Sequence, residues 1–354
     1  MKQSELLFKD VLMMNDMWTV KYRPKMLEDV LGNEESLNAL GQLVSSGNLP
    51  HLVFHGPVNS GKASTAFALA RELYGEGYES NFTYFNASDF FDQGKRYLVR
   101  DKRFTHIIGT DDPKKIYSSV ISIFKTVINE FAGMGSIDAD FKVIFIDNVE
   151  SLDTSAQHAL RRIMEKYTRT CRFVLSTTQP SKLISPLRSR GLELFFTYVP
   201  DELLRPFIVS VAEQEGISIS GDGLDALLYY AEGNVSRALL TLQFASMNNP
   251  GKEITGDVLY EESLCEVSDN VTELHASAIS HEFLKARKLI DTLLIEEGFT
   301  GDEILQQLHS VVMRSDRSEE EIAKAACRIA DADAMIIDSA NARIHLESLV
   351  TELY

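Results

Sequence analysis

A chain of 354 residues is long enough for two or three domains, and a hydrophobic content of 44% allows sizeable cores. No apolar run approaches the roughly 20 residues that a bilayer span needs. The first 17 residues lack the pattern of a signal peptide. Three widely spaced cysteines, Cys171, Cys265 and Cys327, favour neither a disulfide framework nor a zinc site, so we expect a reducing, cytoplasmic setting.

The net charge of −17 argues against nucleic-acid binding by the whole surface. The charge is uneven, because residues from Asn249 onward carry −13 of it. Basic clusters lie at 95–103, 161–172 and 182–190. Each cluster alone is typical of a solvated face, whereas three in an acidic chain favour a surface that faces phosphates. An acidic bulk is also typical of proteins from a high-salt cytoplasm.

Between about Trp18 and Val199, apolar strand-like runs alternate with helix-like stretches. This alternation predicts an α/β fold, with a parallel sheet covered by helices on both faces. The predicted strands are 52–55, 82–86, 142–147, 172–177 and 192–196. The predicted helices between them include 63–74, 116–131 and 155–167. Ligands of such sheets bind at the carboxyl ends of the strands.

A phosphate-binding loop is predicted directly after the first strand. The pattern G-x-x-x-x-G-K-[ST] is matched in all but its last letter by Gly56, Pro57, Val58, Asn59, Ser60, Gly61, Lys62 and Ala63. Strand, loop and helix follow in the order that points backbone N–H groups at a phosphate. Ala63 lacks the hydroxyl that binds Mg²⁺, although Ser64 is adjacent. A glycine-rich turn that binds nothing is the alternative interpretation.

The run 143–147 predicts an apolar strand ending in Asp147, the position that holds Mg²⁺ in nucleotide hydrolases. The next residue is commonly an acid that aligns the attacking water, but here it is Asn148, which cannot take a proton. Glu150 lies two residues further on, within reach of a turn. The alternative is an Asp placed there for turn chemistry alone.

After Pro200 the strand signals fade, and three short helices are predicted at 202–214, 223–232 and 236–247. The polar break 248–251 predicts a boundary, and helical patterns follow to the end of the chain. We therefore predict four parts, namely an N-terminal extension over 1–16, a nucleotide-binding domain over 17–200, a helical lid over 201–250 and a helical domain over 251–354.

Four motifs carry a family resemblance. In chain order they are Trp18-Thr-Val-Lys21-Tyr22-Arg23-Pro24, Asn86-Ala-Ser-Asp89, Ala159-Leu-Arg161-Arg162-Ile-Met164-Glu165-Lys-Tyr167 and Ser189-Arg190. In these motifs the chain resembles the small subunits of replication factor C, the AAA+ clamp loaders, and within them the archaeal type. The motifs cover about residues 17 to 240. The last hundred residues match in being helical and in length.

The resemblance implies an AAA+ module, a three-helix lid and a helical collar that serves oligomerisation. It also implies a five-membered ring with other clamp-loader subunits, which opens a sliding clamp and loads it on primer–template DNA. ATP or ADP is then expected between subunits, Mg²⁺ at Asp147, and Arg190 as the catalytic arginine offered to a neighbour's ATP. The nucleotide-binding residues carried over are Val20, Tyr22, Arg23, Pro24, Gly56, Pro57, Val58, Asn59, Ser60, Gly61, Lys62, Ala63, Ser64, Thr178 and Arg237. A eukaryotic member would be nuclear.

The chain departs from the family pattern where hydrolysis is concerned. Ala63 and Asn148 replace the metal-binding hydroxyl and the acid, Thr178 stands where an Asn sensor is usual, and the lid motif G-D-x-R is Gly233-Asn234-Val235-Ser236 with Arg237 beside it. We therefore expect weak or absent Mg²⁺ and poor hydrolysis in this subunit. Alternatives are a competent ATPase that uses Ser64 and Glu150, and another AAA+ DNA machine such as a helicase or an origin-binding ATPase.

The segment 90–112 is longer than the resemblance leads us to expect. Its apolar stretches, 97–99 and 105–108, predict an added hairpin. Contacts to DNA are expected to be to phosphates, made by Ser181, Lys182 and Arg103, and hence indifferent to sequence.

Overall fold

The computed structural model describes residues 17–91, 94–110, 112–264, 268–315, 317–337, 339 and 341–353. The predicted N-terminal extension, 1–16, and Cys265 lie outside the described residues. The chain divides between Ile254 and Thr255 into two compact units, each with its own core. Within the described residues, no helix is long and apolar enough to cross a membrane.

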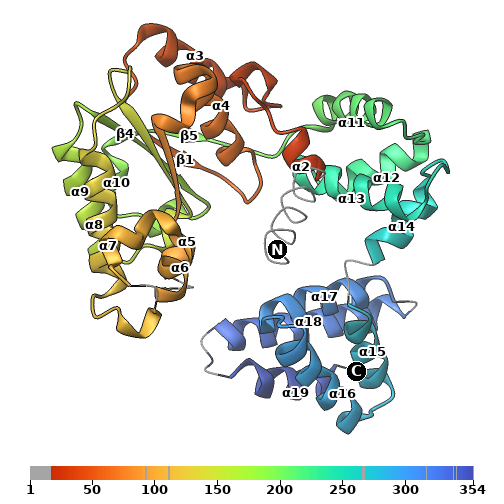
Figure 1. Ribbon diagram of the computed structural model, residues 1–354. Coiled ribbons are helices and arrows are strands. Elements are labelled where there is room, and N and C mark those ends of the chain that lie inside the picture. Colours follow the sequence, from red (N-terminus) through yellow and green to blue (C-terminus); the bar gives the residue numbers. More distant parts are fainter. Residues whose placement is uncertain are drawn as a thin grey trace, which may run out of the picture. The chain divides into compact units, whose positions relative to one another are not determined.

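The first unit contains a five-stranded parallel sheet in the order β2-β3-β4-β1-β5 (Figure 1). Its strands are β1 His51–His55, β2 Phe82–Asn86, β3 Lys142–Asp147, β4 Cys171–Thr177 and β5 Gly191–Phe195. All five predicted strands are confirmed. Because every strand runs in the same direction, all the carboxyl ends lie at one edge, where the candidate loop follows β1.

Helices cover both faces of this sheet, as predicted. The helices that precede β3 in the chain are α2 Trp18–Lys21, which does not pack on the sheet, and α3 Glu34–Ser46, α4 Lys62–Tyr74, α5 Ala87–Phe91, α6 Lys95–Arg100, α7 Thr105–Ile108 and α8 Val120–Gly133. After β3 they are α9 Thr154–Lys166 and α10 Ser185–Arg188. Short 3-10 turns are η1 Leu27–Asp29, η2 Gly75–Ser80, η3 Lys102–Phe104, η4 Pro113–Lys115, η5 Val149–Ser151 and η6 Pro180–Lys182.

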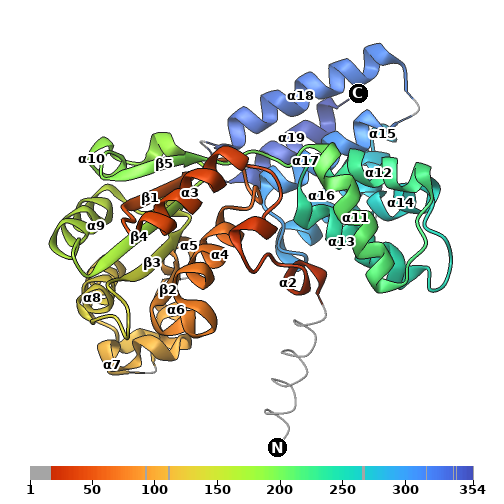
Figure 2. The ribbon, with the colours of Figure 1, turned by 90° about the horizontal axis from the view of Figure 1, so that it is seen from above.

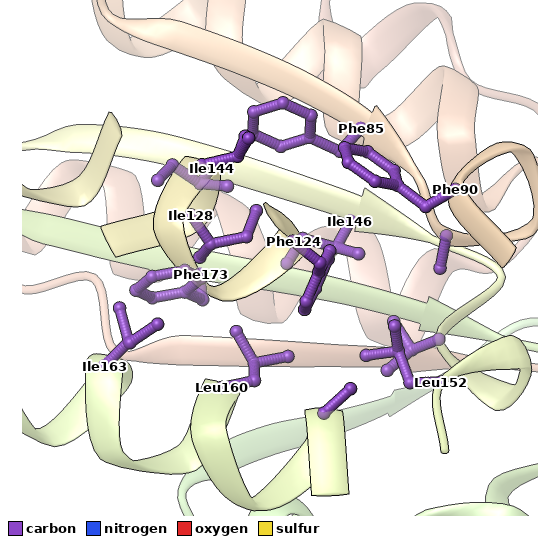
Figure 3. Close-up of a cluster of buried hydrophobic side chains, with 14 of the residues drawn as sticks. Phe85, Phe90, Phe124, Ile128, Ile144, Ile146, Leu152, Leu160, Ile163 and Phe173 are labelled. Atoms are coloured by element: carbon purple, nitrogen blue, oxygen red, sulfur yellow. The ribbon is translucent and has the colours of Figure 1, made fainter. Parts of the chain in front are cut away.

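Alternation along the strands divides the core into two clusters. In β3, Ile144 and Ile146 face α8 and α9, while Val143 and Phe145 face α4 on the other side. Successive side chains of a strand point to opposite faces, so a strand buried on both faces is apolar throughout. Figure 3 shows the first cluster, in which Phe85, Phe90 and Phe124 share one core with Phe173 and with Leu160 of α9.

The predicted hairpin in the segment 90–112 is wrong. The segment forms α6, η3 and α7 instead, followed by η4. Leu98 and Phe104 are fully buried against the phenylalanines of Figure 3, with Ile107 and Ile108 packed behind them. Apolar side chains three to four positions apart reach one core from a helix, whereas a hairpin would turn alternate residues to solvent. The next helix, α8, begins at Val120 rather than at 116, because the Ser119 hydroxyl accepts the Ser122 N–H as its cap.

Three helices follow the sheet in the first unit, close to the predicted ranges: α11 Asp201–Glu215, α12 Gly221–Ala231 and α13 Val235–Asn248. The second unit is helical, with α14 Gly256–Leu264, α15 Asp269–Ile279, α16 Phe283–Asp291, the π-helical turn η7 Thr292–Glu296, α17 Gly301–Met313, α18 Glu319–Ile337 and α19 Ala342–Glu352. Its core joins α15, α16, α17, α18 and α19.

Candidate nucleotide site

The loop between β1 and α4 has the backbone that its glycines require. Gly56 has φ 151°, and a Cβ there would lie 2.0 Å from the carbonyl oxygen of Phe196. Gly61 caps α4 with φ 91°. Both positions disfavour side chains for physical reasons, so the spacing of the two glycines reflects the geometry of a loop that wraps onto a helix start.

Lys62 lies in the concavity of this loop. Its Nζ donates to the carbonyl oxygens of Gly56, at 2.9 Å, and Pro57, at 2.5 Å, and lies 3.3 Å from the Ser60 hydroxyl. Burial lowers the pKa of Lys62, while the carboxylates of Asp147 and Glu150 act in the opposite direction. The carbonyl contacts mark the place where the ammonium group would meet the outer phosphates of a nucleotide.

A cavity of about 360 Å³ opens beside the loop. Its polar end is formed by the loop and the carboxyl ends of β3 and β4, through Asp147, Asn148, Ser176 and Thr178. Its other end is lined mostly by apolar side chains and by residues that precede the sheet: Thr19, Tyr22, Arg23, Pro24, Val30, Leu31, Val199, Phe207, Val235 and Leu239. An apolar pocket with a few convergent polar groups, in this size range, is typical of a small-molecule site.

Most of the residues predicted from the sequence line this cavity. They are Tyr22, Arg23, Pro24, Val58, Asn59, Ser60, Gly61, Lys62, Ala63, Ser64, Asp147 and Thr178. Gly56 and Pro57 do not line it but bond to Lys62, which does, and Thr19 takes the place expected of Val20. Arg237 is not among the lining residues, which from α13 are Val235, Ser236 and Leu239.

Sequence reasoning missed the apolar wall. Val30, Leu31, Val199, Phe207 and Leu239 come from four separate parts of the chain. Each is an ordinary apolar residue in its local sequence, so no pattern distinguishes it from the core. Only the packing of α11 and α13 against the segment after β5 brings these residues together.

The carboxyl end of β3 offers one metal ligand. Burial raises the pKa of Asp147, with Lys62 opposing that shift. Among the described residues, no group of three or more His, Cys, Asp or Glu side chains is placed to hold a metal. Mg²⁺ in nucleotide sites is held by one or two protein oxygens together with phosphates, so Asp147 fits that ion, and Ser64 offers a hydroxyl from the lining.

The two polar residues that follow Asp147 are engaged elsewhere. Asn148 adopts the left-handed conformation, φ 52°, and its Nδ2 donates to Asn86 Oδ1 at 3.1 Å. Glu150 Oε1 accepts the backbone N–H of Thr178, at 3.0 Å, and its hydroxyl, at 2.6 Å. Burial acts to raise the pKa of Glu150, but these bonds outweigh burial and lower it. Glu150 is not among the residues that line the cavity.

Arg190 lies outside this cavity. Its Nε donates to Glu165 Oε1 at 2.7 Å, and its Nη1 donates to the Pro186 carbonyl at 2.5 Å. Glu165 belongs to α9, so the A-L-R-R-x-M-E motif holds the arginine of the Ser-Arg motif. Gly191, the next residue, begins β5 where a Cβ would lie 2.7 Å from Val53 Cγ2.

The cations expected to meet DNA differ in their surroundings. Arg103 is exposed, but its guanidinium is already paired: it bonds both oxygens of Asp101 and donates to the Tyr84 carbonyl at 3.1 Å. Lys182 is exposed at the end of η6. Its backbone carbonyl accepts Gln157 Nε2 at 3.1 Å.

Two family models match the chain. The model of the ATPase family associated with various cellular activities (AAA) matches residues 52–198, and the model of the replication factor C C-terminal domain matches residues 268–352. The chain is 36% identical, over 95% of its length and 95% of the relative's, to the replication factor C small subunit of Methanocella arvoryzae. It is 33% identical to that of Archaeoglobus fulgidus, over 96% of this chain and 97% of the relative.

Solved structures of a RuvB protein from Thermotoga maritima are similar in fold. One point mutant of that protein superposes with a TM-score of 0.51 at 16% identity, over 81% of this chain and 85% of that chain. A structure named as the RuvB Holliday junction branch migration motor gives 0.50 at 17% identity, over 81% and 91%. At this identity the likeness shows the AAA+ fold alone.

Proposed function

The chain belongs to the family of replication factor C small subunits, and from that membership we propose that it is a clamp-loader subunit of DNA replication whose own nucleotide site binds but hardly hydrolyses. In this proposal it stands in a five-membered ring, where ATP helps to load a sliding clamp onto primer–template DNA. Its Arg190 serves the nucleotide of the neighbouring subunit. The match of the C-terminal part to the replication factor C domain supports this role over that of a helicase.

The proposal rests on a contrast between two sets of residues around one cavity, those suited to bind phosphate and those expected to promote hydrolysis. The groups that would bind phosphate are present, namely the Gly56 and Gly61 backbone and the ammonium group of Lys62. The groups that promote hydrolysis are missing, because Ala63 has no hydroxyl and Asn148 has no carboxylate. Nucleotide hydrolysis depends on metal charge and on an aligned water, whereas binding depends mainly on the loop.

The competent alternative requires Ser64 and Glu150 to take over these tasks. Ser64 lines the cavity, which favours it as a metal ligand. One carboxylate oxygen of Glu150 accepts two hydrogen bonds from Thr178, and Glu150 does not line the cavity. A general base must reach the attacking water within about 3 Å, so Glu150 would first have to leave Thr178.

Arg190 has the surroundings of a group that acts on a neighbour. It does not line its own cavity, it is partly exposed, and Glu165 orients it through a charge-assisted bond. A guanidinium keeps its charge and bonds two oxygens at once. Supplied in trans, such an arginine is worth about 10³ or more in rate.

The deciding experiment compares single variants in the complex reconstituted with the cognate subunits and clamp. Arg190→Ala should lower turnover at the neighbour's site by about 10³ and slow clamp loading. Lys62→Ala should change total ATPase little, because the site it serves turns over little. Arg188→Ala is the matched control, since Arg188 lies on the same short segment and is paired with Glu193 instead. If Lys62→Ala is the most damaging of the three, the chain is an ordinary ATPase.

A second measurement addresses the isolated chain. It should bind a fluorescent ADP or ATP analogue, yet show turnover far below the ~1 s⁻¹ of an ordinary phosphoryl-transfer enzyme. Rapid turnover by the chain alone would contradict the degenerate site, and absence of any nucleotide binding would contradict the whole proposal for this cavity.

A further inference from the structure

The segment 94–117 concentrates positive charge in an acidic protein. It contains seven Lys and Arg residues against three Asp residues, within a chain of net charge −17. The segment comprises α6, η3, α7 and η4, with α6 packed on α5 and η4, and α7 packed on α8 (Figure 2). It is therefore an ordered, helical addition to the first unit.

The inner side of this addition is used for structure. Leu98, Phe104 and Ile116 are buried in the core. Arg103 donates to the Tyr84 carbonyl on the free edge of β2, and its guanidinium lies 5.3 Å from the ring centroid of Phe85. Charged groups on an edge strand block further strand pairing. Arg103 thus covers the sheet edge rather than facing a ligand.

The outer side leaves four cations in solvent. Arg96, Arg100, Lys114 and Lys115 are exposed, and none of them forms an ion pair with another described residue. Arg96 and Lys114 share an open hollow of about 480 Å³ with Lys95, Asp112 and Pro113. The Asp112 carboxylate accepts the Lys114 N–H, and Lys95 donates to the Ile116 carbonyl at 2.7 Å, so the hollow is held in shape from within.

The same segment ends in an exposed aromatic residue. Tyr117, two residues after Lys115, is 95% exposed. Among the described residues of this segment, it is the one large hydrophobic residue that is exposed. A protein–protein interface normally needs an apolar core of several residues. Unpaired cations and an exposed ring on one short segment instead match single-stranded nucleic acid, whose phosphates attract the cations and whose unpaired bases stack on the ring.

We propose that the face made by Arg96, Arg100, Lys114, Lys115 and Tyr117, here called the 94–117 face, binds single-stranded nucleic acid. The cations meet backbone phosphates, which carry no sequence information, and Tyr117 stacks on a base. The site is separate from the nucleotide cavity and uses none of its residues. Its failure would therefore leave the proposed function of the cavity untouched.

The test is binding of fluorescein-labelled oligo(dT) of about 20 nucleotides to the full chain, followed by anisotropy over a salt series. Lys114→Ala with Lys115→Ala should lower the slope of log K against log salt by about 1.4, because each phosphate contact on a single strand contributes about 0.7. The control is Lys25→Ala with Lys252→Ala, two exposed lysines whose removal changes the net charge equally. The control should keep the wild-type slope.

Tyr117→Ala should weaken oligo(dT) binding about fivefold or more, the range of base–aromatic stacking. Tyr229→Ala is the control, because Tyr229 is 78% exposed on α12. All the substituted side chains are exposed, so circular dichroism should show unchanged folding. The proposal is overturned if the wild type does not bind at low salt, if both lysine pairs give the same slope, or if polyglutamate of equal charge binds as tightly as DNA. Equal binding of duplex, with no effect of Tyr117→Ala, would also overturn it.

Discussion

In the proposed function, single residues around the phosphate loop divide into those that serve nucleotide binding and those that lack the groups for hydrolysis. Lys62 donates to two carbonyl oxygens of the loop and Asp147 lies at the end of β3, the two positions that the proposed nucleotide binding uses. Ala63 and Asn148 stand where a hydroxyl and an acid would complete the chemistry. Asn148 suits its place for a second reason, because Asn tolerates the left-handed backbone better than most residues.

Restoring the lost groups should restore hydrolysis. We expect Ala63→Thr with Asn148→Glu to raise ATP turnover at this subunit's site in the assembled complex, since it returns a metal ligand and a water-aligning acid. The matched control is Ala63→Val with Asn148→Gln, which reproduces the shapes without the chemistry. Steady-state ATPase assays of both complexes check this, and equal rates would mean that other parts of the site limit hydrolysis.

A buried histidine predicts how stability depends on pH. His51 Nδ1 accepts the Phe173 N–H at 3.1 Å, and burial, with Arg172 nearby, lowers the pKa of His51 to about 4. The unfolded chain takes up this proton near pH 6.5, so stability is complete above that pH and falls as the pH drops toward 4. From pH 7.5 to pH 5 the loss from this group is about 2 kcal/mol.

His51→Asn keeps an acceptor for the Phe173 N–H and removes the titration. Urea unfolding at pH 7.5 and pH 5 measures the free energy of unfolding of the wild type and of His51→Asn. Between the two pH values, this free energy should fall less in His51→Asn than in the wild type. The control is His158→Asn, at an exposed position. Its free energy of unfolding should fall between pH 7.5 and pH 5 by as much as that of the wild type. A variant with the wild-type pH dependence would show that His51 does not titrate in this window.

At the scale of elements, the short helix α2 links α11 and α13 to the cavity. Lys21 Nζ lies 2.6 Å from Glu215 Oε1, and the Tyr22 hydroxyl donates to the same oxygen at 2.5 Å. The Trp18 N–H donates to Gln243 of α13 at 3.1 Å. Tyr22 also lines the cavity, so one carboxylate at the end of α11 positions a wall of the nucleotide site.

This link should affect nucleotide affinity. Glu215→Ala should weaken binding of a fluorescent nucleotide about fivefold, the usual effect of one hydrogen bond. Tyr22→Phe should have little further effect in the Glu215→Ala background, because both changes remove the same bond. Glu213→Ala, an exposed acid on the same helix, is the control. Full affinity of Glu215→Ala would show that Tyr22 needs no such support.

At the scale of the whole molecule, the chain consists of two units that differ in charge and in construction. The unit Thr255–Tyr354 has an all-helical core of its own and carries −13 of the net charge of −17. The first unit is close to neutral and contains both the cavity and the 94–117 face. A polyanion would thus be repelled by the second unit and accepted only at local sites of the first.

The second unit should fold without the first. A fragment of residues 255–354 should unfold cooperatively in urea, because its buried apolar residues contact one another. Ile304→Ala, at a fully buried position of α17, should cost about 2–5 kcal/mol. Ile344→Ala, at a position 60% exposed on α19, should cost less than about 0.5 kcal/mol. A fragment without a cooperative transition would show that this core depends on contacts outside it.

The sequence by itself determined the parallel sheet, the phosphate loop, the three helices after Pro200 and the family. Each of these rests on local signals, such as an apolar run of strand length, a glycine spacing typical of a phosphate-binding loop, or a motif of adjacent residues. Such signals survive without knowledge of the fold, because backbone preferences and burial periodicity act within a few positions of the chain.

Only the tertiary structure decided which side chains meet across long separations in the chain. Glu215 accepts a hydrogen bond from Tyr22, and Glu150 accepts one from Thr178. Phe207 lines the same cavity as Lys62. The tertiary structure also decides which cations of one segment are paired. Arg103 covers a strand edge, whereas Lys114 and Lys115 remain in solvent. A cation's local sequence does not reveal its partner, because burial and pairing depend on what the rest of the chain brings beside it.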